Sequence, residues 1–187
     1  MRHEALSIQY TFGGHSFLFQ SDAGLFSKNK VDFATDLLLR CLPPLSGSFL
    51  DLGCGYGCIG TVLGQINSGL SITMADVSPR ALEYARRNAV QNGVAAEVIH
   101  SDGFDKLDAL YDAITLNPPI HAGKAVVWRL YEGAYEHLRP GGVFYVVIQR
   151  KHGAPSSQAR LTEIFGACRA VYAKKGFFVF ACVKQAA

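Results

Sequence analysis

The glycine-rich stretch at residues 49–60, FLDLGCGYGCIG, constrains the fold of this chain more than any other feature. An apolar run at 48–52 leads into it, and Gly53, Gly55 and Gly57 follow at every second position. Glycine has no Cβ, so this turn can take positive φ angles and let a ligand approach the backbone. The turn and the helix N-terminus after it expose N–H groups that favour an electronegative group. We therefore expect a strand, a turn and a helix in an open α/β sheet, with the turn binding a ligand at the carboxyl end of the strand.

The turn by itself leaves two kinds of cofactor open. Gly55, Gly57 and Gly60 spell G-x-G-x-x-G, the pattern typical of dinucleotide-binding folds. Asp51, however, places a carboxylate just ahead of the glycines, where it would repel a pyrophosphate. A carboxylate at that point suits a cofactor that carries an amino group and a sulfonium charge.

The composition fits one domain with a buried sheet. The chain has 187 residues, 49% of them hydrophobic, and a mean hydropathy of +0.15. We expect a single domain at 1–187, with an N-terminal hairpin and helix appendage at 1–46 and a cofactor-binding catalytic core at 47–187. The net charge of +3 is compatible with a nucleic-acid partner without requiring one.

The location expected from the sequence is cytoplasmic. No apolar run approaches the roughly 18 residues of a membrane span, and the N-terminus has no signal-peptide apolar region. The five cysteines form no paired C-x-x-C units, which argues against zinc and fits reduced thiols.

The rest of the chain alternates strands with helices, which predicts a mostly parallel sheet covered on both faces. A hairpin is expected at 7–20 around Gly13-Gly14, and a helix that opens at Val31 or Asp32 and ends at Pro43-Pro44. The other expected helices are 57–66, 78–92, 124–137 and 158–165. The expected strands are 48–52, 70–76, 95–100, 111–116, 143–149, 169–173 and 177–183. The last two strands would form a hairpin across 174–176, making the final strand antiparallel to its neighbour.

Three acidic residues fall at successive strand ends: Asp51, Asp76 and Asp102. In a doubly wound sheet these ends lie side by side along one rim. Asp76 comes about twenty residues after the glycines, where a carboxylate can accept two ribose hydroxyls. That feature does not separate an adenosyl cofactor from a nicotinamide dinucleotide, because both present a ribose. Asp102 and Gly103, with Phe104, could meet the edge and face of an adenine.

The sequence Asn117-Pro118-Pro119 predicts a stiff turn just past the fourth expected strand of the sheet. Such a turn can hold the Asn117 amide oxygen and the Pro118 carbonyl as a pair of acceptors for an NH₂ group. With both hydrogens held, the nitrogen lone pair faces an electrophile, so catalysis would consist of positioning.

With these motifs in place, the chain resembles the class I S-adenosylmethionine-dependent methyltransferases across residues 48–183. The resemblance is carried by DLGCGYG at 51–57 and NPP at 117–119. The flanks resemble the small bacterial 16S rRNA guanine-N2 methyltransferases, through GLFS at 24–27, VDxxTxLLL at 31–39 and VVIQRKHGAPS at 146–156. That branch has an aromatic residue and then His after NPP. Here His121 matches, and Ile120 departs from the aromatic residue.

The resemblance implies a doubly wound, seven-stranded, Rossmann-like methyltransferase fold that binds S-adenosyl-L-methionine and needs no metal. It implies methyl transfer to the guanine N2 amine in ribosomal RNA or the small ribosomal subunit. The catalytic turn would be Asn117, Pro118 and Pro119. The cofactor-binding residues would be Asp51, Gly53, Gly55, Gly57, Asp76, Val77, Asp102, Gly103 and Asn117. The substrate-binding candidates are Phe26, Lys28, His121, Arg150 and Lys151.

Because Ile120 is not aromatic, base stacking must come from another residue, and Phe26 and Phe104 are the candidates considered. Three alternative functions stay open. Methylation of a protein glutamine or a DNA adenine also uses Asn-Pro-Pro. A nicotinamide-dependent oxidoreductase would need a hydride-transfer acid or base, and none is well placed. The chain could also be a non-catalytic RNA-binding ribosome assembly factor.

Overall fold

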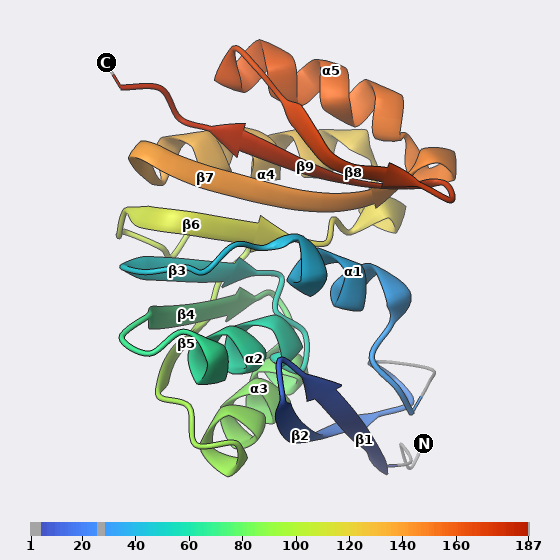
Figure 1. Cartoon of the computed structure of the whole chain (residues 1–187), viewed down its shortest axis with the longest axis vertical. Coiled ribbons are helices and arrows are strands. Elements are labelled where there is room, and N and C mark those ends of the chain that lie inside the picture. The colour runs from blue at the N-terminus through green and yellow to red at the C-terminus, as the bar shows by residue number, and fades with distance from the viewer. Residues whose placement is uncertain (1–4, 26–28, 187) are drawn as a thin grey trace.

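The computed structural model describes residues 5–25 and 29–186 and contains a seven-stranded sheet with a separate two-stranded hairpin (Figure 1). The strand order is β5-β4-β3-β6-β7-β9-β8. All neighbouring strands are parallel except β9, which runs antiparallel to both β7 and β8. The expected doubly wound sheet is thereby confirmed. The strands are β3 (Ser48–Leu52), β4 (Ser71–Asp76), β5 (Ala96–His100), β6 (Tyr111–Leu116), β7 (Leu138–Gln149), β8 (Arg169–Lys174) and β9 (Phe177–Val183).

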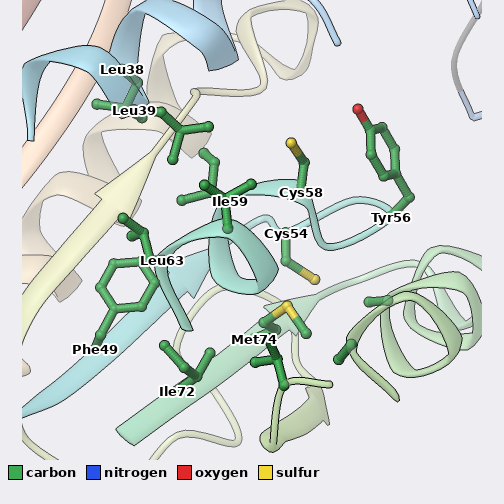
Figure 2. Packing of buried hydrophobic residues seen from close by; sticks show 14 of the residues in the cluster. Leu38, Leu39, Phe49, Cys54, Tyr56, Cys58, Ile59, Leu63, Ile72 and Met74 are labelled. Atoms are coloured by element: carbon green, nitrogen blue, oxygen red, sulfur yellow. The ribbon is translucent and has the colours of Figure 1, made fainter. Parts of the chain in front are cut away.

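Helices cover both faces of the sheet, and each face has its own buried cluster. The helices are α1 (Phe33–Cys41), α2 (Cys58–Ile66), α3 (Pro79–Gln91), α4 (Lys124–Glu136) and α5 (Ala154–Phe165). Side chains of α1, α2 and α3 belong to one cluster, and those of α4 and α5 belong to the other. Figure 2 shows the first cluster, with Leu38 and Leu39 of α1 near Ile59 of α2, and Leu63 beside Phe49 of β3. Burial of these apolar side chains is the main force that seats the helices on the sheet.

The N-terminal hairpin packs on the helices of the first face. Strands β1 (Ala5–Phe12) and β2 (His15–Asp22) are joined by the predicted two-residue turn, with φ of 58° at Gly13 and 78° at Gly14. Figure 1 places the hairpin beside α2 and α3, at the opposite end of the molecule from β8.

Asn88 of α3 and Asn92, the residue that caps the end of this helix, tie the hairpin down. The Asn88 side chain is fully buried, accepts a hydrogen bond from the Gln20 N–H at 2.8 Å and donates to the carbonyls of Gln20 and Tyr56. Asn92 makes a similar pair of bonds with the Leu18 backbone. The hairpin is therefore fixed to the sheet unit by polar bonds as well as by apolar packing.

Strand β7 and helix α5 begin four to five residues earlier than predicted, and the hairpin extends two residues beyond its expected bounds at each end. Strand β7 starts at Leu138 rather than at residue 143, and its pairing with β6 shifts register between Tyr111 and Ala113. The Gly141 N–H donates to the Lys184 carbonyl at 2.7 Å, and the Lys184 N–H donates to the Gly142 carbonyl at 2.9 Å, which adds this segment to the sheet. Helix α5 starts at Ala154 rather than at residue 158, because a proline is tolerated in the first turn of a helix.

Candidate functional site

The carboxyl ends of β5, β4, β3 and β6 lie next to one another, as their order in the sheet requires. This places Asp51, Asp76, Asp102 and Asn117 along one rim, since each stands at or just after one of these strand ends. The chain reverses its winding direction between β3 and β6, and the crevice at such a point is where open α/β sheets bind ligands.

The glycine turn takes the backbone conformation that its sequence predicted. Gly53, Gly55 and Gly57 have φ angles of 66°, 57° and 90°, values that residues with a Cβ rarely adopt. Gly60 has a different role, because a Cβ there would lie 2.7 Å from the Met74 sulfur of β4. The turn therefore needs glycine for its shape, and α2 needs glycine for its close approach to the sheet.

Two carboxylates of the rim hold this turn in place. The Asp76 carboxylate accepts a hydrogen bond from the Gly55 N–H at 2.9 Å, and from the Ser78 N–H at 2.9 Å. The Asp51 carboxylate accepts one from the Gly60 N–H in the first turn of α2, at 3.0 Å. The N–H groups of Gly55 and Gly60, which would otherwise face an anion, are thus paired with negative side chains of the chain itself.

The Asp51 carboxyl group is deeply buried, with 2% of the residue exposed. Burial raises the pKa of this carboxyl to about 7, the Gly60 N–H opposes the rise, and the neighbouring Asp76 carboxylate adds to it. A group with such a pKa can exchange its proton near neutrality when a cation comes close. Asp51 therefore suits contact with an ammonium or sulfonium group.

A cleft of about 420 Å³, here called the β4–α4 cleft, runs along the ends of β4 and β5. The predicted residues on its wall are Gly53, Asp76, Val77, Asp102, Gly103, Asn117 and Pro119. Val77 leaves 61% of its surface exposed at the cleft, and the Asp102 carboxylate pairs with Arg129 at 3.0 Å. Apolar surface beside two carboxylates can receive a flat ring and the sugar attached to it.

The far wall of this cleft comes from α4 and was not predicted. The α4 residues are Val126, Arg129 and Leu130, and Ala122, just before the helix, adjoins them. Val126 and Leu130 are four residues apart and so lie on one face of the helix, a spacing visible in the sequence. What the spacing could not reveal is that this face borders the cleft.

A smaller cavity of about 220 Å³, the glycine-turn pocket, adjoins the cleft. It is lined by Asp51, Gly53, Gly55, Tyr56 and Asn117 among others. Thr35 of α1 also lines it, a residue that the sequence reasoning did not select. The Thr35 hydroxyl donates to the Asp32 carboxylate at 2.6 Å, which fixes the first turn of the helix beside the pocket.

The Asn117-Pro118-Pro119 segment forms a tight turn whose backbone is fixed by its own hydrogen bond. The Ile120 N–H donates to the Pro118 carbonyl at 2.9 Å, and Pro119 has φ −76° and ψ 79°, the conformation of an inverse γ-turn. One lone pair of the Pro118 carbonyl is thereby used, and a carbonyl oxygen retains a second. The Asn117 side chain is exposed and borders the cleft and the pocket just described.

A third cavity of about 510 Å³, the α1–β9 pocket, lies on the other side of this turn. Its wall includes Asn117, Pro118, Pro119, Ile120 and the predicted His121. Phe33 of α1 and Phe177 of β9 form its aromatic side, with ring centroids 4.7 Å apart. Asn117 is therefore shared by all three cavities.

Four described candidates line none of these three cavities: Gly57, Phe104, Arg150 and Lys151. Phe104 stacks on His137 with centroids 4.4 Å apart, which occupies one face of its ring. Arg150 is exposed and lies over the Phe178 ring at 5.3 Å, and Lys151 borders a groove next to the α1–β9 pocket. Phe26 and Lys28 lie outside the described residues.

Within residues 5–25 and 29–186, no group of three or more His, Cys, Asp or Glu side chains is arranged to hold a metal ion. No helix in the described part of the chain combines the length and the apolar composition that crossing a bilayer requires.

Comparison with known proteins adds the following findings. The protein-family model described as methyltransferase small domain matches residues 16–181. Bacillus subtilis (strain 168) has a relative named Uncharacterized protein YbxB, which is 42% identical over 173 residues, or 90% of this chain and 86% of that protein. Ribosomal RNA small subunit methyltransferase C of Aeromonas hydrophila is 39% identical over 128 residues, covering 66% of this chain and 37% of that protein.

Among solved structures, the T. thermophilus 16S rRNA N2 G1207 methyltransferase (RsmC), in complex with AdoMet and guanosine, matches with a TM-score of 0.86. The two sequences are 29% identical, and the match covers 97% of this chain and 51% of that one. This chain thus spans about half the length of the solved methyltransferase and less than half of its Aeromonas relative.

Proposed function

Because this chain belongs to the methyltransferase small domain family, with S-adenosylmethionine as its cofactor, we propose that it methylates the exocyclic N2 amine of a guanine in ribosomal RNA. The observation that carries this proposal is the position of Asn117, which borders the β4–α4 cleft, the glycine-turn pocket and the α1–β9 pocket. An amide at this junction can touch both a cofactor on one side and an acceptor amine on the other.

The electrostatics of the rim support a cationic cofactor over a dinucleotide. The Gly55 and Gly60 N–H groups already donate to Asp76 and Asp51, so they are not free to hold a pyrophosphate. A phosphate here would also lie beside two carboxylates. An ammonium and a sulfonium would instead gain from the same charges.

On this proposal the adenosine lies in the β4–α4 cleft, with its ribose hydroxyls on the Asp76 carboxylate and its adenine between Val77 and the α4 wall. Asp102 and Gly103 would meet the adenine edge. The methionine part lies in the glycine-turn pocket, where Asp51 receives the ammonium and Thr35 closes one wall. When bound, the cofactor supplies a methyl group on a positively charged sulfur.

The target amine would be held by the Asn117 side-chain oxygen and the second lone pair of the Pro118 carbonyl. Both N–H bonds of the amine then point at acceptors, so its lone pair faces the methyl group. Bound in this way, the cofactor would supply the methyl group and leave as a neutral thioether, and the methylated amine would release one proton to water. The chain contributes alignment, and no step requires a strong base.

The relatives support ribosomal RNA as the substrate. The Aeromonas relative is named for the small ribosomal subunit RNA, and the Thermus structure is titled for guanine N2. Those proteins are longer than this chain, so the choice of nucleotide and of naked RNA or assembled subunit is part of the proposal.

The direct test is nucleoside mass spectrometry of ribosomal RNA from cells with and without the gene. We expect N2-methylguanosine at one position to disappear without the gene and to return with the wild-type copy. An unchanged nucleoside profile would contradict the proposal. Incubation of the purified protein with labelled S-adenosylmethionine and separate RNA, DNA and protein fractions then distinguishes the alternatives. Label in DNA adenine or protein glutamine, or cofactor binding without transfer to any fraction, would each replace the proposed reaction.

A further inference from the structure

The α1–β9 pocket contains an aromatic pair that the cofactor does not need, the exposed Phe33 and the half-buried Phe177. Phe33 is the first residue of α1 and leaves 53% of its surface exposed. Its ring lies against Phe177 at a centroid distance of 4.7 Å and an interplanar angle of 58°. Exposure of a phenylalanine on the wall of a cavity is unfavourable in water, and a ligand that covers the ring would remove that cost.

The rest of the pocket supplies polar groups opposite this apolar side. Asn117 forms part of the wall shared with the cofactor side, and Gln149, His121 and His152 also border the pocket. Gln149 pairs with Phe177 across β7 and β9, so the polar and aromatic groups meet at one strand end. A flat ligand with hydrogen-bonding edges fits this combination, and a nucleobase has both properties.

The size of the pocket also favours a base over a single amide side chain. Its volume of about 510 Å³ lies within the range of roughly 300–1,000 Å³ that is typical of small-molecule sites. A glutamine side chain would fill little of this space and would leave the Phe33 ring in water.

Ile120 cannot provide the stacking surface in this chain. Its side chain is half-buried, packs against the cluster beneath α4 and α5, and has no aromatic ring. Phe104 is also excluded, because it stacks on His137 and does not border the α1–β9 pocket. Among the described residues that line this pocket, Phe33 and Phe177 are the two that carry a phenyl ring.

We propose that the target guanine stacks on Phe33, backed by Phe177, while Asn117 holds its exocyclic amine. This inference rests on the proposed function and adds the residues that bind the base. Phe33 then stands in for the aromatic ring missing at Ile120, from a different element and on the same pocket.

The test compares Phe33→Leu with Phe33→Tyr. Leucine keeps an apolar side chain and removes the ring, whereas tyrosine keeps the ring. Base–aromatic stacking of about 1–3 kcal/mol corresponds to a loss of roughly 5- to 150-fold in kcat/KM for the RNA in Phe33→Leu. We expect Phe33→Tyr to stay within about threefold of wild type. The matched control is Leu110→Ala, which alters an exposed apolar side chain before β6, away from all the cavities described.

Two measurements separate a lost base contact from a damaged fold. Affinity for S-adenosylmethionine, measured by calorimetry, should be unchanged within about twofold in each variant. Binding of guanosine, followed by NMR titration of the protein with S-adenosylhomocysteine present, should weaken in Phe33→Leu and not in Leu110→Ala. The double variant Phe33→Leu with Ile120→Phe should recover part of the lost kcat/KM, because it returns a ring to the same pocket.

The outcomes for this inference and for the proposed function are distinct. Wild-type protein that methylates no guanine refutes the function itself. Wild-type activity with an equally active Phe33→Leu variant overturns only the stacking role. Equal losses in Phe33→Leu and Phe33→Tyr, with cofactor affinity intact, would also overturn it, because the ring would then not be what matters.

Discussion

The buried carboxyl group of Asp51 should make the affinity for S-adenosylmethionine depend on pH. In the free protein its pKa is about 7, so near neutrality this carboxyl is only partly ionised. Contact with the cofactor's ammonium would favour the ionised form and lower the pKa in the complex. Binding then releases a proton below pH 7, and affinity rises with pH until Asp51 is ionised in the free protein as well.

The size of the effect follows from the ionised fraction. With a pKa of about 7, roughly 3% of Asp51 is ionised at about pH 5.5 and roughly half at about pH 7.0. If only the ionised form binds, affinity increases roughly fifteenfold over this range, or about 1.6 kcal/mol. The range ends there because an α-ammonium group begins to lose its own proton near pH 8. The Cys54 and Cys58 thiols beside Asp51 stay neutral, since burial and the Asp51 charge raise the pKa of both.

Isothermal titration calorimetry across this pH range, in buffers of different ionisation enthalpy, measures both the affinity and the released proton. The matched variant is Asp51→Asn, whose amide oxygen can still accept the Gly60 N–H. We expect the variant to bind about as weakly as wild type at the acid end and to show no pH dependence. If the affinity of the wild type did not change with pH, or changed equally in Asp51→Asn, then Asp51 would only stabilise the glycine turn and would not contact the cofactor.

Two other substitutions test the catalytic turn and the hairpin. Asn117→Ala should lower methyl transfer by at least about a hundredfold and leave the dissociation constant for S-adenosylmethionine nearly unchanged; full turnover in this variant would refute the amine-holding role. Asn88→Ala should lower the free energy of unfolding by roughly 2–4 kcal/mol in urea titration, because it removes three hydrogen bonds of a fully buried side chain, one to the buried Tyr56 carbonyl and two to the partly buried Gln20 backbone. Asn92 is half-buried, so Asn92→Ala should lower the free energy of unfolding by only about 1 kcal/mol. Equal losses of stability in the two variants would contradict the claim that burial makes the Asn88 bonds more important.

Local signals predicted most of the elements. The Gly13-Gly14 turn requires positive φ at both residues, and the structure has it. Asp32 and Ser78 cap the helices that follow them, as short side chains with a suitable oxygen do. The predicted start of β7 was wrong because Pro140-Gly141-Gly142 has the local sequence of a turn. Its strand pairing comes from Lys184, a partner more than forty residues away.

The site was predicted where a residue's role depends on its own strand end, and missed where it depends on packing. Asp76 ends its strand and Asn117 directly follows its own, so their place on the rim could be predicted from the sequence. Thr35 and Phe33 reach the cavities only because α1 packs across the sheet beside β7 and β9. No sequence periodicity records that arrangement, so neither residue was selected from the sequence.

The first turn of α1 has a consequence for how two ligands would influence each other. Thr35 faces the glycine-turn pocket while Phe33 faces the α1–β9 pocket, and the Asp32 carboxylate holds them in one short turn. The two pockets thus share this turn as a common wall. A ligand in one pocket would restrict the motion of this turn. Less conformational entropy of the protein would then be lost when a ligand binds in the other pocket. Guanosine should accordingly bind more tightly to the S-adenosylhomocysteine complex than to the free protein. Equal affinities would mean that the first turn of α1 is already rigid in the free protein.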